Sequence, residues 1–229
     1  MRILVVAGGG YHDFKNNTKA LVDGVVAQAP HLSFTLWRKG PGPFPEGMKE
    51  TAAGIAEKGA LDGIGVVLAY SQGELGWSAE EKEALLRFVR GGGGFVALHS
   101  GGDSHPGWDE YDRLVGGRFE SHPPFQKIKV DICSPDHDAV RCLSGALEVE
   151  DEYYHMKDCA LDDKLVLLKG TSPGDGKERP AAWAKEYGRG RVFYTILGHG
   201  IQTHSHPAFH AMVAHAIAWA ARAPAPDAG

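Results

Sequence analysis

Hydrophobic residues in the first hundred positions fall in short runs that alternate with amphipathic stretches. The runs at residues 2–7, 64–70 and 95–98 are almost entirely apolar, and the pattern is typical of strands buried on both faces of a sheet. Residues 32–37 alternate apolar and polar positions and indicate a further strand. Such strands, separated by helical segments, predict a parallel sheet with helices on both faces.

Three helices are expected between these strands. The first is capped by Asn16 or Asn17 and continues to about Ala29, with apolar residues at helical spacing. A weaker helix follows a proline-rich loop and ends near Lys58. The third begins at residues 78–81, Ser-Ala-Glu-Glu, which form a capping box.

The pattern changes in the second half of the chain. Residues 103–165 combine short apolar segments with polar and aromatic clusters, which predicts an antiparallel or irregular insertion beside the sheet. We therefore expect a single α/β domain over residues 1–222, with this insertion, and a frayed tail over residues 223–229.

Strands resume after the insertion. Residues 165–168 and 191–197 indicate buried strands, and residues 181–184 indicate a short edge strand between them. His206 and Pro207 then indicate a cap and a first helical residue, before a final helix with one apolar face.

Charge and composition exclude several kinds of partner. The formal charge is −5 and the pI is about 6.2, so no basic field invites a nucleic acid. No apolar run approaches the roughly 18 residues of a membrane span, so we expect no membrane partner. The three cysteines carry no CxxC motif, and we expect a reduced, cytoplasmic protein rather than a Cys133–Cys142 bridge.

Residues 91–108, GGGGFVALHSGGDSHPGW, place polar side chains directly after a buried strand. His99 and Ser100 end the strand, and Gly101 and Gly102 then supply residues that permit a turn through positive φ. Ligand crevices in open α/β sheets lie outside the carboxyl ends of the strands. This pair therefore marks a candidate site, with capping of the next segment as the alternative.

Histidines follow three of the predicted strands: His12, His99 and His199. Because parallel strands end at one edge of the sheet, we expect these three side chains to converge. The insertion adds His122, Glu152 and His155 if it lies over the same edge. Such a set can bind a divalent metal such as zinc, with His99, His122 and His199 as ligands, and it can equally supply acid–base groups.

Roles follow from these positions. The expected catalytic residues are His99, His12, Glu152 and Asp103, with Asp103 orienting His99. The expected substrate-binding residues are Ser100, His122, Tyr153, His155 and His199. No nucleotide cofactor is expected, because the glycines after the first strand lack dinucleotide spacing. A serine hydrolase is disfavoured, because Ser100 lacks a GxSxG frame.

Aromatic residues near these loops suit the binding of a sugar, with core packing as the alternative. They are Trp77, Trp108, Tyr111, Tyr153, Tyr154 and Tyr187.

Several ordered motifs resemble the ThuA-like family, which is named for trehalose utilisation. They are residues 93–103 (GGFVALHSGGD), 116–119 (GGRF), 122–123 (HP), 151–153 (DEY), 182–183 (AW) and 188–199 (GRGRVFYTILGH). The resemblance implies a flavodoxin-like fold of the class I glutamine amidotransferase type, a three-layer sandwich around a mainly parallel sheet. It places His99 near the elbow where amidotransferases carry a nucleophilic cysteine. This chain lacks that cysteine, so we expect no glutaminase activity.

The resemblance also implies a role in disaccharide catabolism, and keto-sugars are one class of intermediate that this role can involve. We expect a hydrolase or lyase that acts on a small-molecule sugar through a histidine-rich site. The alternative is a non-catalytic sugar-binding or regulatory protein on the same scaffold. Assembly into a homo-oligomer is compatible with either.

Overall fold

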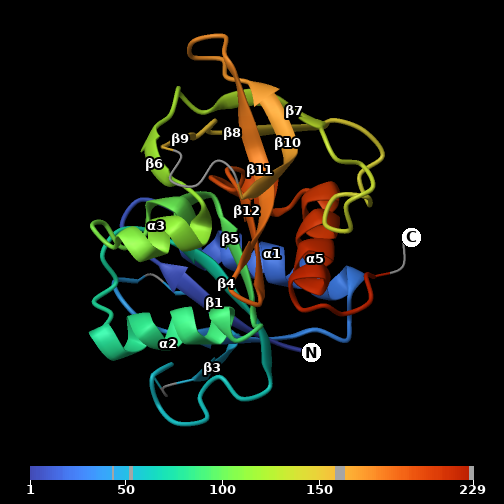
Figure 1. The fold of residues 1–229 in the computed structure, drawn as a ribbon. Helices are drawn as coiled ribbons and strands as arrows, with labels where there is room; N and C mark the ends of the chain where they lie inside the picture. Colours follow the sequence, from blue (N-terminus) through green and yellow to red (C-terminus); the bar gives the residue numbers. More distant parts are fainter. Residues whose placement is uncertain (43, 52–53, 158–162, 227–229) are drawn as a thin grey trace.

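A computed structural model describes residues 1–42, 44–51, 54–157 and 163–226, and Figure 1 shows its fold. The strands are β1 (Arg2–Gly8), β2 (Ser33–Trp37), β3 (Lys49–Thr51), β4 (Ile64–Ser71), β5 (Gly94–Leu98), β6 (Arg118–Ser121), β7 (Gln126–Ile132), β8 (Leu147–Asp151), β9 (His155–Lys157), β10 (Lys164–Thr171), β11 (Glu178–Tyr187) and β12 (Gly190–Thr195). The α-helices are α1 (Phe14–Gln28), α2 (Ala79–Arg90), α3 (Asp109–Val115), α4 (Ile201–His204) and α5 (Pro207–Ala220), and residues His99–Asp103 form a 3-10 helix, η1.

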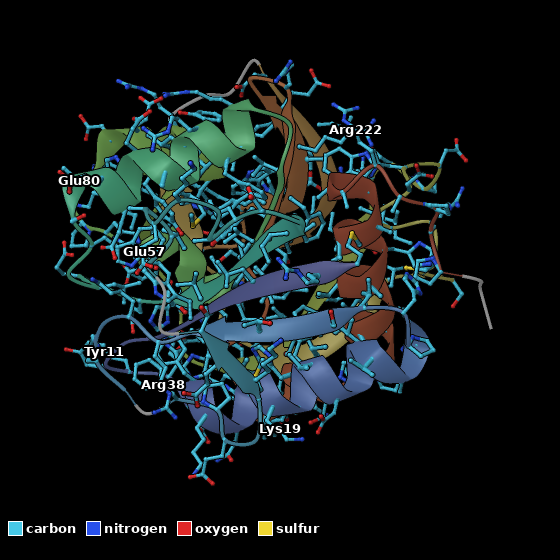
Figure 2. The ribbon with its side chains drawn as sticks, turned by 90° about the horizontal axis from the view of Figure 1, so that it is seen from below. Tyr11, Lys19, Arg38, Glu57, Glu80 and Arg222 are labelled. Atoms are coloured by element: carbon cyan, nitrogen blue, oxygen red, sulfur yellow. The ribbon has the colours of Figure 1, made fainter. Side chains whose placement is uncertain are left out.

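Ten of these strands form one sheet, in the order β3-β2-β1-β4-β5-β12-β11-β10-β7-β8. Neighbours from β3 to β12 pair in parallel, and the five strands from β2 to β12 have the order of flavodoxin-like sheets. Helices α1 and α5 lie on one face, and α2 and α3 lie on the other (Figures 1 and 2). The predicted α/β fold with a mainly parallel central sheet is confirmed.

The remaining strands are antiparallel. Strand β11 pairs with β12 and with β10, while β7 and β8 form a hairpin that extends the sheet beyond β10. Ile132 and Asp131 of β7 pair with β10, and the N–H of the next residue, Cys133, donates to the carbonyl of Leu167, so the hairpin joins the sheet through a short ladder. Strands β6 and β9 form a separate two-stranded sheet. The insertion therefore lengthens the main sheet as well as lying beside it.

Two secondary-structure predictions are wrong. Residues 181–184 lie in an interior strand, not an edge strand, because Ala182 pairs with both Thr195 and Leu168. The expected helix ending near Lys58 is replaced by β3 and turns, and Gly59 and Gly63 within those turns have positive φ. Positions 52 and 53 of that helix lie outside the described residues.

Helix starts agree closely with the sequence pattern. The capping box of α2 is present, with Ser78 and Glu81 bonding each other's backbone, and the His206 side chain accepts from the N–H of Ala208 at the start of α5. Helix α1 begins earlier than expected, because Asp13 rather than an asparagine is its cap. The Asp13 carboxylate accepts the N–H of Asn16 at 3.0 Å.

Other expectations concern cysteines, the membrane and the tail. Cys133 and Cys142 are free, whereas Cys159 lies outside the described residues. None of the described helices combines the length and apolarity needed to cross a bilayer. Residues 223–226 form neither helix nor strand, and 227–229 lie outside the described part.

Candidate functional site

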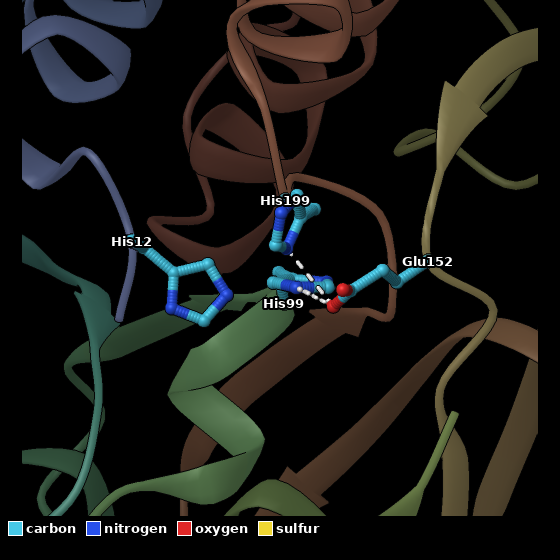
Figure 3. A group of neighbouring side chains, drawn as sticks. All are labelled: His12, His99, Glu152 and His199. Carbon is cyan, nitrogen blue, oxygen red and sulfur yellow. Dashed lines mark ion pairs between the residues drawn. The ribbon is translucent and has the colours of Figure 1, made fainter. Parts of the chain in front are cut away.

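Three histidines and one glutamate converge at the carboxyl edge of the sheet. His12, His99 and His199 follow β1, β5 and β12, and Glu152 follows β8. One potential ligand atom from each lies within 4.8 Å of those of the others. Figure 3 shows the four side chains pointing toward one another. The predicted convergence of the three histidines is confirmed, and we refer to the four residues as the His–Glu cluster.

His99 occupies a strained position directly after β5. Its φ is 44°, a left-handed conformation that is uncommon for residues other than glycine and is found at functional sites. The Tyr194 hydroxyl supports this turn by donating to the His99 carbonyl at 2.8 Å.

The two glycines after His99 have a different purpose from the expected one, because neither has positive φ. They permit close packing instead. A Cβ at Gly101 would lie 2.9 Å from the backbone oxygen of Ala69, and one at Gly102 would lie 2.5 Å from the Tyr194 hydroxyl.

Hydrogen bonding fixes the tautomer of His99. Its Nδ1 donates to the carbonyl oxygen of Ile196 at 2.6 Å, so Nε2 carries the lone pair. That Nε2 is buried, lies 3.6 Å from Oε2 of Glu152, and has no hydrogen-bond partner in the part of the chain that the structure describes. A buried nitrogen lone pair beside a carboxylate is a typical arrangement for a metal ligand.

A hydrogen bond also fixes the tautomer of His12, but its partner is a side chain rather than a backbone carbonyl. Its Nδ1 lies 3.1 Å from Oε1 of Gln72, and the Gln72 amide donates to Asp103 at 2.8 Å. Because the amide is the donor to Asp103, Oε1 accepts from His12 and leaves Nε2 of His12 with its lone pair. Asp103 thus orients His12 through Gln72, whereas we expected it to orient His99.

Glu152 is the negative charge of the cluster. Its Oε2 lies 2.9 Å from Nδ1 of His199. Burial alone would raise the pKa of Glu152, but the neighbouring imidazoles of His199 and His99 outweigh it and hold that pKa well below its ordinary value. Burial, assisted by the neighbouring His99 and His199, lowers the pKa of His12 to about 3. At neutral pH the cluster therefore contains a carboxylate and a neutral His12.

Asp151 is a buried carboxylate that the sequence analysis did not select. Its Oδ1 accepts the N–H groups of Glu152 and His199, and its Oδ2 accepts the N–H of Gly198 and the hydroxyl of Thr203. It therefore fastens the loop that carries His199 to the end of the strand that precedes Glu152. Residues 147–152 alternate apolar and acidic side chains and end in Asp-Glu. That pattern does not indicate that the carboxylates of Asp151 and Glu152 have different roles.

Four other predicted residues lie outside the cluster. His122 lies at its edge, 3.5 Å from Glu152, but its Nδ1 is also 2.9 Å from the carbonyl of Pro123. Tyr153 donates its hydroxyl to carbonyl oxygens of β10 and β11, and His155 bonds Ser172. Ser100 is fully buried, and its hydroxyl has no partner among the described residues.

Tyr154 takes the place that was expected for Tyr153. Its ring centroid lies 3.8 Å from that of His99, and its hydroxyl lies 3.5 Å from Nε2 of His12. Of the other aromatic candidates, Trp77 and Tyr111 are buried in the core. For these residues the core-packing alternative is the correct one.

The cluster supplies three imidazole nitrogens and a carboxylate, a donor set that suits zinc and other divalent transition metals. Among the described residues, the facing Nε2 of His99 is buried without a hydrogen-bond partner, which agrees with an electron-pair acceptor in the cluster. Of the expected ligands His99, His122 and His199, the first and last lie in this cluster with His12 and Glu152, whereas His122 lies at its edge.

Comparison with solved structures shows the same fold in other proteins. A thua-like protein from Parabacteroides merdae superposes with a TM-score of 0.77 at 19% identity, covering 96% of this chain and 90% of that one. Another from Bacteroides uniformis has a TM-score of 0.68 at 16% identity, covering 96% and 91%. The carbohydrate deacetylase Agd3 has a TM-score of 0.60 at 10% identity, covering 96% of this chain and 32% of its own.

Sequence comparison gives the family. No match was found among curated proteins. The family model described as trehalose utilisation, ThuA, matches residues 2–220. Because that match spans nearly the whole domain, including all four residues of the His–Glu cluster, the chain belongs to the ThuA family, which is linked to carbohydrate utilisation.

Proposed function

We propose that this protein is a metal-dependent carbohydrate enzyme, a hydrolase or lyase that acts on a disaccharide, glycoside or keto-sugar. The observation that carries the proposal is the convergence of three imidazoles and a carboxylate at one point, with ligand atoms within 4.8 Å of one another. Family membership supports the carbohydrate substrate. The free thiols of Cys133 and Cys142 support a reducing compartment such as the cytoplasm.

Some residues would bind the cation, and others would orient these ligands. His12, His99, His199 and Glu152 would hold the cation, and Gln72 and the Ile196 carbonyl would keep the two oriented imidazoles in the ligand tautomer. A divalent cation held there would supply a Lewis acid that polarises a sugar carbonyl or activates water. Tyr154 covers the His99 ring and would exclude bulk water from that side.

Zinc titration calorimetry tests the proposal on the metal-free protein. We expect wild type to bind zinc and both His99→Asn and Glu152→Gln to lose it. Asparagine suits position 99 because it tolerates positive φ. His31→Asn changes an exposed histidine and should bind zinc as wild type does.

A panel of disaccharides, glycosides and keto-sugars then tests turnover by the zinc-loaded protein. Turnover that is lost in both cluster variants would support the enzyme. Zinc binding that is absent from wild type, or unchanged in both variants, would overturn the metal site. Sugar binding without turnover would identify a binding protein instead.

A further inference from the structure

A cleft of about 300 Å³ opens beside the His–Glu cluster. His12 and His199 form part of its lining, and Tyr11, Asn17, Phe125 and Ile201 lie around them. The cluster residues on its wall make this cleft a direct approach to the candidate site. Its volume is at the lower end of the range for small-molecule sites.

Exposed apolar side chains gather around this cleft. Among the described residues, the large hydrophobic side chains that are exposed are Tyr11 (87%), Phe125 (38%), Ile201 (43%) and Leu165 (49%), and all but Leu165 line it. Figure 2 shows Tyr11 at the surface of the molecule. Apolar side chains that are costly to leave in water and that gather at one opening mark a binding surface.

Asn17 places an unused hydrogen-bond acceptor in the same cleft. The residue is only 1% exposed, and its amide nitrogen donates to the Tyr70 hydroxyl at 2.9 Å and to the carbonyl of His199 at 3.1 Å. These two acceptors fix the amide orientation, so Oδ1 is the free end. Oδ1 is buried and has no hydrogen-bond partner among the described residues.

The lining of the cleft therefore favours a ligand with two properties. It needs an apolar face, to cover the rings of Tyr11 and Phe125, and a hydroxyl donor, to satisfy Oδ1 of Asn17. A pyranose ring has both, because its C–H groups form apolar faces and its hydroxyls lie around the rim. An apolar peptide or lipid would leave the Asn17 acceptor unpaired.

We propose that this cleft is a subsite for the second ring of a two-ring substrate, with Tyr11 and Phe125 as stacking residues and Asn17 as the hydroxyl acceptor. This inference rests on the proposed function, in which the reacting ring lies beside the cation held by the His–Glu cluster. The ring contacts select disaccharides and other glycosides with a ring-shaped second unit over free monosaccharides.

Titration calorimetry with trehalose, cellobiose and glucose tests the subsite in the zinc-loaded protein. We expect at least one disaccharide to bind more tightly than glucose. Tyr11→Ala and Phe125→Ala should each weaken that disaccharide by about tenfold, the equivalent of about 1.4 kcal/mol, and leave glucose unchanged. Tyr11→Phe keeps the ring and should bind the disaccharide as wild type does. Leu165→Ala removes the exposed apolar side chain away from the cleft and should have no effect.

Two results would overturn the subsite. One is that both disaccharides bind no more tightly than glucose, and the other is that both alanine variants bind them as wild type does. Failure of the proposed function would be observed separately, because wild type would then show no zinc binding or no turnover. Tyr11 and Phe125 contribute no cluster ligand, so their variants should retain zinc and thereby distinguish the two failures.

Discussion

The backbone N–H of His199 donates a 2.9 Å hydrogen bond to the carboxylate of Asp151, the residue immediately before Glu152. This bond ties together two cluster residues that lie far apart in the sequence and on different halves of the sheet. Asp151 itself is fully buried, and its charge is balanced by three backbone N–H groups and a hydroxyl. It is therefore a positioning residue for the site.

Asp151→Asn should weaken both the site and the fold. The amide NH₂ would face a group that now donates to the carboxylate, and leaving such a buried donor unpaired costs about 1–3 kcal/mol. Urea unfolding measures that loss of stability, and zinc titration measures the loss of affinity. Asp131→Asn, at an exposed position on β7, is the matched control. Equal zinc affinity in wild type and Asp151→Asn would refute the positioning role.

Gln72→Leu should reduce metal affinity without a large change in stability. The substitution removes the oxygen that accepts the His12 Nδ1 proton, so the ring no longer prefers the tautomer with a lone pair on Nε2. Loss of such an outer contact lowers metal affinity by about 10- to 100-fold. Zinc titration checks this, with Gln28→Leu at the exposed end of α1 as the control. A variant with wild-type zinc affinity would show that Gln72 does not hold the tautomer.

Gly102→Ala should disturb the turn at His99 through its contact with Tyr194. The added Cβ would lie 2.5 Å from the Tyr194 hydroxyl, which donates to the His99 carbonyl. Overpacking of this kind costs about 1–3 kcal/mol, measured by thermal or urea unfolding. Gly145→Ala provides the control, because the added Cβ would meet no atom of the described residues within 4 Å. Equal stability of the two variants would contradict this account of the glycine.

His105 should contribute to acid unfolding. Burial lowers its pKa to about 4 from 6.5, so the unfolded chain binds a proton between these values that the folded chain does not. Stability from this residue is complete above pH 6.5 and falls, by about 3 kcal/mol in total, as the pH drops to 4.

His105→Asn removes this titration and retains a residue that tolerates the φ of 56°. Urea unfolding at a series of pH values should therefore show a shallower loss of stability below pH 6.5 in the variant. Parallel pH profiles for the two proteins would count against the assignment.

The parallel half of the fold could be predicted because its strands are buried on both faces. Continuous apolar runs such as residues 64–70 have few alternatives in a chain of this composition. The edge strand β3 could not be predicted from the sequence, because Lys49–Thr51 carries no apolar pattern. It is a strand only through its pairing with β2. The position of strand β11 in the sheet was misjudged because three alanines and one tryptophan at residues 181–184 give little indication of neighbours on both sides.

The three histidines of the site could be predicted from topology, since each follows a parallel strand. The roles of Gln72, Asp151 and Tyr154 could not, because they depend on which side chain faces which across the fold. Asp103 shows the difference: its place shortly after His99 in the sequence suggested a partner for His99, yet an intervening glutamine directs it to His12. Whether the predicted residues act in catalysis or binding stays a prediction.

The short ladder between β7 and β10 has a consequence for how the molecule opens. A hairpin held to the sheet by so few backbone pairs is expected to detach in local fluctuations well below the free energy of global unfolding. Glu152 follows this hairpin, whereas the three histidines belong to the parallel half. Asp151 already joins the end of β8 to the loop that carries His199, and a ligand that binds all four residues would add a second cross-link between the hairpin and the parallel strands. Amide hydrogen exchange in β7 and β8 would then slow toward the rate of the core strands, merging two cooperative units into one.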